Sequence, residues 1–224
     1  MAKENLHKNE GAEVVAEAVS KTDLFFKEYG KLMAIILAVL VVLGAGALCW
    51  YKFLYQPAVV EAQGQMTSAE QSFAEGDFET ALNGDGNALG FAQIVEEYGS
   101  KAGKSVYLYA GICELQLGNW DSALKYLNSY KGKDEILAAR AEACKGDAYV
   151  GLENYEKALA HFEKAAAKVD NMFAATYLLK AGLTAEKLGQ DDKALSFYKT
   201  IKDKYPQSME GYDVDKYIGR IENK

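Results

Sequence analysis

The chain has 224 residues, with 25 Lys or Arg against 32 Asp or Glu, so that its formal net charge is −7. This acidic balance gives it no electrostatic footprint for nucleic acid, and we expect no nucleic-acid partner. Two prolines and abundant Ala, Leu, Lys and Glu predict an all-α fold.

Residues 1–31 carry an amphipathic helical pattern. Apolar residues recur at spacings of three and four, and Glu13, Glu17 and Lys21 share another face. Two interpretations stay open: a helix on the inner leaflet or against a membrane partner, or a helical lead-in to the next segment. The apolar positions are Val14, Val15, Ala18, Val19, Phe25 and Phe26.

From Leu32 to Trp50 no side chain is charged or strongly polar. As a helix this stretch is roughly 28 Å long, which matches the ~30 Å hydrocarbon core of a bilayer. We therefore predict a transmembrane helix over residues 32–51. Lysines are concentrated before the span, and only Lys52 follows it closely, so we expect a cytoplasmic N-terminus and an exported C-terminal part.

Two alternatives to a permanent anchor are a cleaved signal peptide and a lipoprotein. The bulky residues of Leu48–Tyr51 crowd the possible cleavage point, and a lipidated Cys49 would need a small residue before it. We expect the span to be retained. Small residues within it either let another membrane helix pack closely or are ordinary filler. They are Ala34, Ala38, Gly44 and Gly46.

About 170 residues follow the span, enough for one domain over residues 52–224. Its first unit, 58–103, is irregular. A turn at Glu75–Asp77 precedes Ala81 and Leu82, and the segment Asn83–Asn87 then interrupts the pattern. Its Asp, Asn and Gly residues are the materials of a calcium loop, but the spaced acids and terminal Glu are absent, so a turn or bulged helix is favoured.

The following residues repeat with a period of 35 to 36. Gly111, Gly146 and Gly182 are spaced by 35 and 36, and so are Ala123, Ala158 and Ala194. Between each Gly and its Ala lies a turn, and after each Ala-Leu pair comes an aromatic residue. These aromatic residues are Tyr126, Phe162 and Phe197-Tyr198. Pro206 stands where such a repeat ends.

This pattern resembles the tetratricopeptide repeat family, whose 34-residue unit is a pair of antiparallel helices. The resemblance implies a solenoid of helical hairpins with repeats at 104–138, 139–174 and 175–207, and a capping helix over 208–222. Small Gly and Ala would let the paired helices approach, and the aromatic residue of the second helix would fill the gap between repeats.

We find no pattern that points to catalysis or to a resident cofactor or metal. The two histidines, His7 and His161, fall on opposite sides of the predicted membrane, and phosphate-loop, CxxC and HExxH motifs are absent. Beyond Cys49, the cysteines Cys113 and Cys144 are expected as free buried thiols, and a disulfide between them in an oxidising periplasm is the alternative. We expect a non-enzymatic protein.

Repeats of this family usually bind partners on the concave surface formed by their first helices. The corresponding positions here are mostly apolar, with isolated charges at Arg140 and Asp147, and they suit an extended polypeptide or a partner helix. Packing between helices is the alternative role for each of them. The positions are Met66, Phe73, Leu108, Ile112, Leu115, Arg140, Asp147, Val150, Leu179 and Leu183.

The stretch Glu17–Val19, Phe25–Lys31, the span and Trp50-Tyr51 is similar to the ancillary translocon subunit of Gram-negative bacteria. That resemblance implies an inner-membrane protein with a periplasmic repeat domain that associates with the SecYEG channel and with exported polypeptides or periplasmic folding factors. The alternative is a scaffold of another envelope machine, for cell division or outer-membrane assembly, with one fixed partner.

Overall fold

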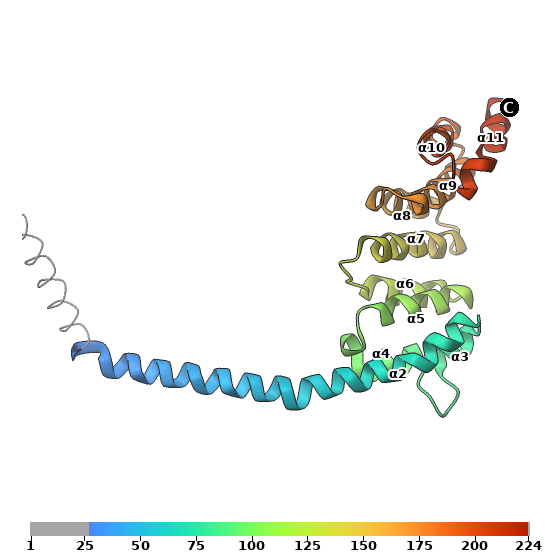
Figure 1. The fold of residues 1–224 in the computed structure, drawn as a ribbon. Coiled ribbons are helices and arrows are strands. Elements are labelled where there is room, and N and C mark those ends of the chain that lie inside the picture. The colour runs from blue at the N-terminus through green and yellow to red at the C-terminus, as the bar shows by residue number, and fades with distance from the viewer. Residues whose placement is uncertain (1–26, 224) are drawn as a thin grey trace, which may run out of the picture. The chain divides into compact units, whose positions relative to one another are not determined.

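The computed structural model describes residues 27–223, which divide after Pro57 into two units (Figure 1). Most of the predicted amphipathic segment 1–31 therefore lies outside the described residues. The two units are described separately below.

The first unit is helical. Residues 27–50 form an α-helix that continues through the π-helical segment η1 (Tyr51–Tyr55), where the rings of Tyr51 and Tyr55 stack with centroids 5.7 Å apart. The whole helix, Lys27–Ala74, contains an 18-residue window with a mean hydropathy of 2.9 and none of that window is buried. By length and composition it is able to cross a membrane. Gly44 and Gly46 have open space around them, so their packing role stays a prediction.

The second unit consists of helices in hairpins, with no strand among the described residues, which confirms the predicted all-α solenoid. An irregular opening unit is followed by three regular hairpins and a final helix. The helices in chain order are α2 (Gln56–Ala74), α3 (Phe78–Asn83), α4 (Phe91–Tyr98), the 3₁₀ segment η2 (Gly99–Ala102), α5 (Ser105–Gln116), α6 (Trp120–Ser129), α7 (Glu135–Gly151), α8 (Tyr155–Lys168), α9 (Met172–Lys187), α10 (Asp191–Lys204) and α11 (Met209–Glu222).

The regular hairpins close on a glycine of the first helix. A Cβ on Gly111 would lie 2.7 Å from Cγ of Leu127, and one on Gly146 would lie 2.5 Å from Cε1 of Phe162. Gly182 faces Tyr198 in the same way. Phe162 and Tyr198, which were expected to fill the gap between repeats, thus contact the glycine of their own hairpin, whereas in the first hairpin Leu127 and not Tyr126 does so. The contact falls sixteen residues after each glycine, and this register puts Leu127 there.

The same tight turn joins the two helices of each hairpin. Gly76, Gly118, Glu153 and Gly189 all have positive φ, between 56° and 80°, and each donates its N–H to the carbonyl three residues earlier. The next residue donates to the carbonyl five residues earlier, which makes a Schellman closure. Glu153 is the one residue with a side chain in this left-handed conformation among residues 27–223.

In the irregular unit, residues of α4, which follows the α2–α3 hairpin, fill the core. Helix α3 ends at Asn83, and a loop held by the Asp85 carboxylate, which accepts from the N–H groups of Asn87 and Ala88, leads into α4. Phe91 of α4 is completely buried and stacks on Tyr109 with centroids 5.0 Å apart. The Asn83–Asn87 interruption is thus a turn that brings α4 against α2, α3 and α5.

Because successive helices run in opposite directions, their ends form two edges of the domain. We call the edge with the tight turns, residues 75–77, 117–119, 152–154 and 188–190, the turn edge. The opposite edge, with the connections 98–105, 130–137, 168–173 and 205–212 and the start of α2, is the connection edge (Figure 1). The first helices α2, α5, α7 and α9 and the final helix α11 all begin at the connection edge.

Candidate functional site

Two hollows contain predicted groove residues. The smaller one, which we call the N-terminal hollow, has a volume of about 230 Å³ and lies between α2, α5 and α7. Its lining residues are Phe73, Ser105, Leu108, Tyr109, Ile112, Leu137 and Arg140. Four of these were predicted from the sequence as groove positions. The wall is therefore built by the helices that the repeat pattern assigns to the concave surface.

Aromatic contacts make one wall of the N-terminal hollow rigid. The ring of Phe73 packs edge-on against Tyr109, with centroids 5.1 Å apart, and Tyr109 stacks on the buried Phe91. Leu108 and Ile112 form the floor, since only 4% and 7% of their surface is exposed. The hollow is thus preformed, with an apolar floor that a ligand contacts at little conformational cost.

The C-terminal hollow is larger, about 570 Å³, and lies between the C-terminal ends of α7, α9 and α11 and the start of α8. Val150 and Leu183 are its apolar side chains, each more than a third exposed. The remaining lining residues are Tyr155, Thr184, Glu186, Lys187 and Arg220.

A carboxylate fixes the polar side of the C-terminal hollow. Glu186 accepts a hydrogen bond from the Tyr198 hydroxyl at 2.6 Å and one from the Arg220 guanidinium at 2.5 Å. Burial, followed by the hydrogen bond to Glu186, raises the pKa of Tyr198, so the phenol stays protonated and donates. Glu186 therefore ties the final helix α11 to α9 and α10 and holds Arg220 at the rim.

An ion pair also joins two first helices of the concave surface. Lys180 Nζ of α9 lies 2.7 Å from both carboxylate oxygens of Asp147 on α7. Burial raises the pKa of Asp147, and this outweighs the opposite effect of Lys180. The pair fixes the spacing of α7 and α9, and it leaves the Asp147 carboxylate neutralised by its partner.

Positive charge is left over on this surface. The chain has only two arginines, Arg140 and Arg220, and each lines one of the two hollows. In the C-terminal hollow Glu186 pairs with Arg220, which leaves the charge of Lys187 unbalanced, and the nearby Asp147 pairs with Lys180. The concave surface of an acidic domain thus combines apolar hollows with basic rims, a combination that suits apolar side chains next to carboxylates.

The structure distributes the ten predicted groove residues unequally. Six of them line the hollows, as given above. Met66 is only 5% exposed and packs in the core of the irregular unit, whereas Leu115 and Leu179 are half-buried and pack against core clusters. The sequence reasoning missed Tyr109, Tyr155, Glu186 and Arg220. The scarcity of arginine was the one signal that could have indicated Arg220.

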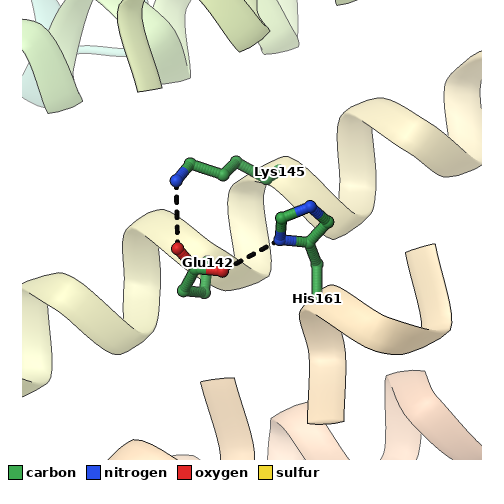
Figure 2. Close-up of polar contacts among 3 residues, drawn as sticks. All are labelled: Glu142, Lys145 and His161. Atoms are coloured by element: carbon green, nitrogen blue, oxygen red, sulfur yellow. Dashed lines mark hydrogen bonds and ion pairs between the residues drawn. The ribbon is translucent and has the colours of Figure 1, made fainter. Parts of the chain in front are cut away.

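A second polar cluster lies between α7 and α8 (Figure 2), and its residues are not among those lining the N-terminal or C-terminal hollow. The Glu142 carboxylate binds Lys145 Nζ at 3.0 Å and His161 Nδ1 at 2.9 Å, and the His161 ring stacks on Tyr149. Burial alone would raise the pKa of Glu142, but the hydrogen bonds and charges of Lys145 and His161 together hold it below its ordinary value. This cluster joins the two helices of one hairpin.

The described part of the chain contains no group of three or more His, Cys, Asp or Glu side chains that could hold a metal ion. Cys113 and Cys144 are not joined to each other, and burial raises the pKa of the two thiols to about 12 and about 11. Both thiols therefore stay protonated at neutral pH, which makes them poor nucleophiles.

Comparison with known proteins supports the repeat assignment. Residues 105–134 and 145–208 match models of the tetratricopeptide repeat, and the matched residues include parts of all three regular hairpins. Proteins built of such repeats are generally scaffolds for protein–protein interaction rather than enzymes. No curated protein sequence matches the chain.

Two solved structures of MamA are similar in fold. One has a TM-score of 0.57 at 19% identity and covers 73% of this chain and 84% of its own. The other has a TM-score of 0.52 at 20% identity, and the match covers 69% of this chain and 92% of that MamA chain. At this identity the similarity shows the fold alone.

Proposed function

We propose that the protein is a membrane-anchored scaffold that binds polypeptide on the concave surface of its repeat domain, as an accessory subunit of protein export. In this proposal Leu32–Trp50 spans the bacterial inner membrane with residues 1–31 in the cytoplasm. The repeat domain then stands in the periplasm next to the SecYEG channel. Exported polypeptides or periplasmic folding factors occupy the two hollows.

The observation that carries the binding role is the pair of preformed hollows with basic rims. An extended segment places alternate side chains on one face, so that apolar residues can enter the hollows while its acidic residues meet Arg140 and Lys187. The export role is supported by the anchor region, whose residues resemble the ancillary translocon subunit, and by the apolar helix Lys27–Ala74.

Site-specific photocrosslinking in native membranes tests the binding role. A photoreactive amino acid at Leu137 or Leu183, both 38% exposed and each in one hollow, should crosslink many different exported polypeptides. Asn128, exposed on the second helix α6, is the matched control and should give little product. One dominant protein would favour the scaffold of another envelope machine, and the absence of hollow-specific products would reject the binding role.

The export role has its own test. After gentle detergent extraction, the protein should co-purify with SecYEG, and Arg140→Gln with Lys187→Gln should reduce client crosslinking without reducing SecYEG recovery. The reason is that these two residues lie on the repeat domain's binding surface and not in the anchor. Recovery free of the channel, with unchanged export in a deletion strain, would contradict the export role and leave the binding role standing.

A further inference from the structure

The most exposed large apolar side chains of the repeat domain share one location. Within residues 58–223, six of them have more than 40% of their surface exposed, and all six fall in the first five residues of α2, α7, α9 or α11. They are Val60 (70%), Ile136 (44%), Met172 (66%), Phe173 (54%), Met209 (85%) and Tyr212 (77%). All six thus lie on the connection edge, away from the turn edge.

Hydrogen bonds and one shared hollow show that these helix starts form one continuous edge. Tyr130, Lys131 and Lys168 line one hollow, which links the connections 130–137 and 168–173. Hydrogen bonds join the remaining neighbours along the edge. These bonds are Tyr98–Glu61 at 3.3 Å, Lys104–Lys131 carbonyl at 3.0 Å, Tyr205–Asp170 at 2.8 Å and Thr176–Glu210 at 2.6 Å. The exposed apolar residues therefore stand along a single side of the stack and are not scattered over it.

The charges of the two edges differ. The connections 98–105, 130–137, 168–173 and 205–212 together hold five lysines and four acids. The turns 75–77, 117–119, 152–154 and 188–190 hold three acids and no lysine or arginine. An anionic surface is therefore repelled least at the connection edge, although the chain as a whole is acidic.

The chain enters the repeat domain at this same edge, since α2 begins there. Between Trp50 and Ala58 an extended chain covers at most roughly 28 Å. If Leu32–Trp50 spans a bilayer, the start of α2, at one end of the connection edge, stays within that distance of the lipid surface. Tethering of this kind raises the effective concentration to the millimolar range, so weak contacts are sufficient.

We propose that the connection edge rests on the phospholipid surface in which the chain is anchored. Met172, Phe173, Met209 and Tyr212 insert at the level of the headgroups, where Phe and other large apolar side chains bind and Tyr keeps its hydroxyl in water. The inference rests on the proposed anchor and goes beyond it. It makes the repeat domain lie along the membrane, with the first helices pointing away from the lipid and both hollows open to the side.

Tryptophan fluorescence in the full-length protein tests this seating. The chain has two tryptophans, Trp50 at the end of the apolar span and Trp120 at the start of α6 on the turn edge. The protein is reconstituted in nanodiscs of brominated phosphatidylethanolamine and phosphatidylglycerol, which quench only tryptophans close to the lipid. Trp120→Phe isolates Trp50, and Trp50→Phe isolates Trp120. Phe173→Trp is then placed in the double Trp→Phe background, and Leu152→Trp, on the turn edge with 38% exposure, is its matched control.

The proposal expects Phe173→Trp to be quenched several-fold more than Leu152→Trp or Trp120. Strong quenching of Trp50 without quenching of Phe173→Trp would overturn the seating and leave the anchor intact. An unquenched Trp50 would overturn the anchor, and the seating with it. Shielding of Phe173→Trp that grows with protein concentration in detergent micelles without lipid would assign the patch to a second copy and overturn the seating as well. Circular dichroism of each variant confirms that the helices are retained.

Discussion

In the regular hairpins a glycine of the first helix receives a large side chain of the second, whereas the irregular unit has no such pair. Ala69, which takes the equivalent place on α2, is 2% exposed, and α3 ends before it can supply a partner. Phe91, which follows the loop, fills the space instead. The regular part thus closes each hairpin with its own residues, and the irregular part closes only when α4 returns to it.

The difference teaches how far each region depends on local sequence. Contacts such as Gly146–Phe162 join residues sixteen apart, and loop closure over so short a distance costs little entropy. The irregular unit relies on the aromatic cluster of Phe73, Phe91 and Tyr109, which brings three helices together. We expect this unit to be the more sensitive to loss of a single ring.

The largest effect should come from Phe91→Ala. It removes a fully buried ring stacked on Tyr109 and should lower the free energy of unfolding by about 3–5 kcal/mol. Hydrogen exchange of the full chain in detergent should rise in α2–α5 more than in α9–α11, because repeat stacks transmit stability mainly to neighbours. Phe78→Ala, which removes a half-buried ring of the same cluster, is the control and should cost less. A uniform rise in hydrogen exchange over all helices would contradict the difference between the irregular unit and the regular hairpins.

Gly146→Ala should destabilise the second regular hairpin. The added Cβ would lie 2.5 Å from the Phe162 ring, and such overpacking costs about 1–3 kcal/mol, more than the ~1 kcal/mol gained from alanine in a helix. Gly64→Ala in α2 is the matched control: nothing lies within 4 Å of its Cβ, so we expect a gain of about 0.5–1 kcal/mol. Thermal unfolding measures both. Equal effects of the two substitutions would show that the glycine contact does not close the hairpin.

The sequence predicted the hairpins well because the Gly and Ala positions report directly how closely two helices approach. It could not tell that Leu127 and not Tyr126 meets Gly111, because both side chains are large and only the register of the packed helices decides between them. It could not predict α4 as the filler of the irregular unit, since that depends on the path of the loop. Arg220 was missed for a similar reason: α11 reaches the hollow of α7 and α9 only in the folded stack.

Glu142→Gln tests the contact of Glu142 with Lys145 and His161, which joins α7 and α8 in the second regular hairpin. Because the pKa of Glu142 is lowered in the folded state, the charged carboxylate stabilises the protein above the unfolded pKa of roughly 4, and this contribution disappears as pH falls through the folded pKa. The variant should lose about 1 kcal/mol at neutral pH, and the loss should vanish in acid.

Asp147, which also lies on α7, should have the opposite effect on the pH dependence of stability. Its pKa is raised, so its charge opposes folding above the folded pKa, and wild-type protein gains from its protonation as pH falls. Asp147→Asn should abolish that gain. Urea unfolding at several pH values measures both variants, and parallel pH profiles for the two would contradict the assignment.

The smallest effect concerns the turn that the irregular unit and the regular hairpins share. Three of the four turns place glycine at the left-handed position, whereas Glu153 holds φ at 56°. A side chain there costs roughly 1–2 kcal/mol, and glycine recovers this minus its own entropy cost of about 0.5–1 kcal/mol. Glu153→Gly should therefore stabilise the domain by up to ~1 kcal/mol, measured as a rise in Tm. Gly189→Ala is the mirror control, since its Cβ meets nothing within 4 Å and only the backbone strain remains, so it should lower Tm. If both substitutions left Tm unchanged, the turns would differ in strain between hairpins, and the four would no longer be equivalent.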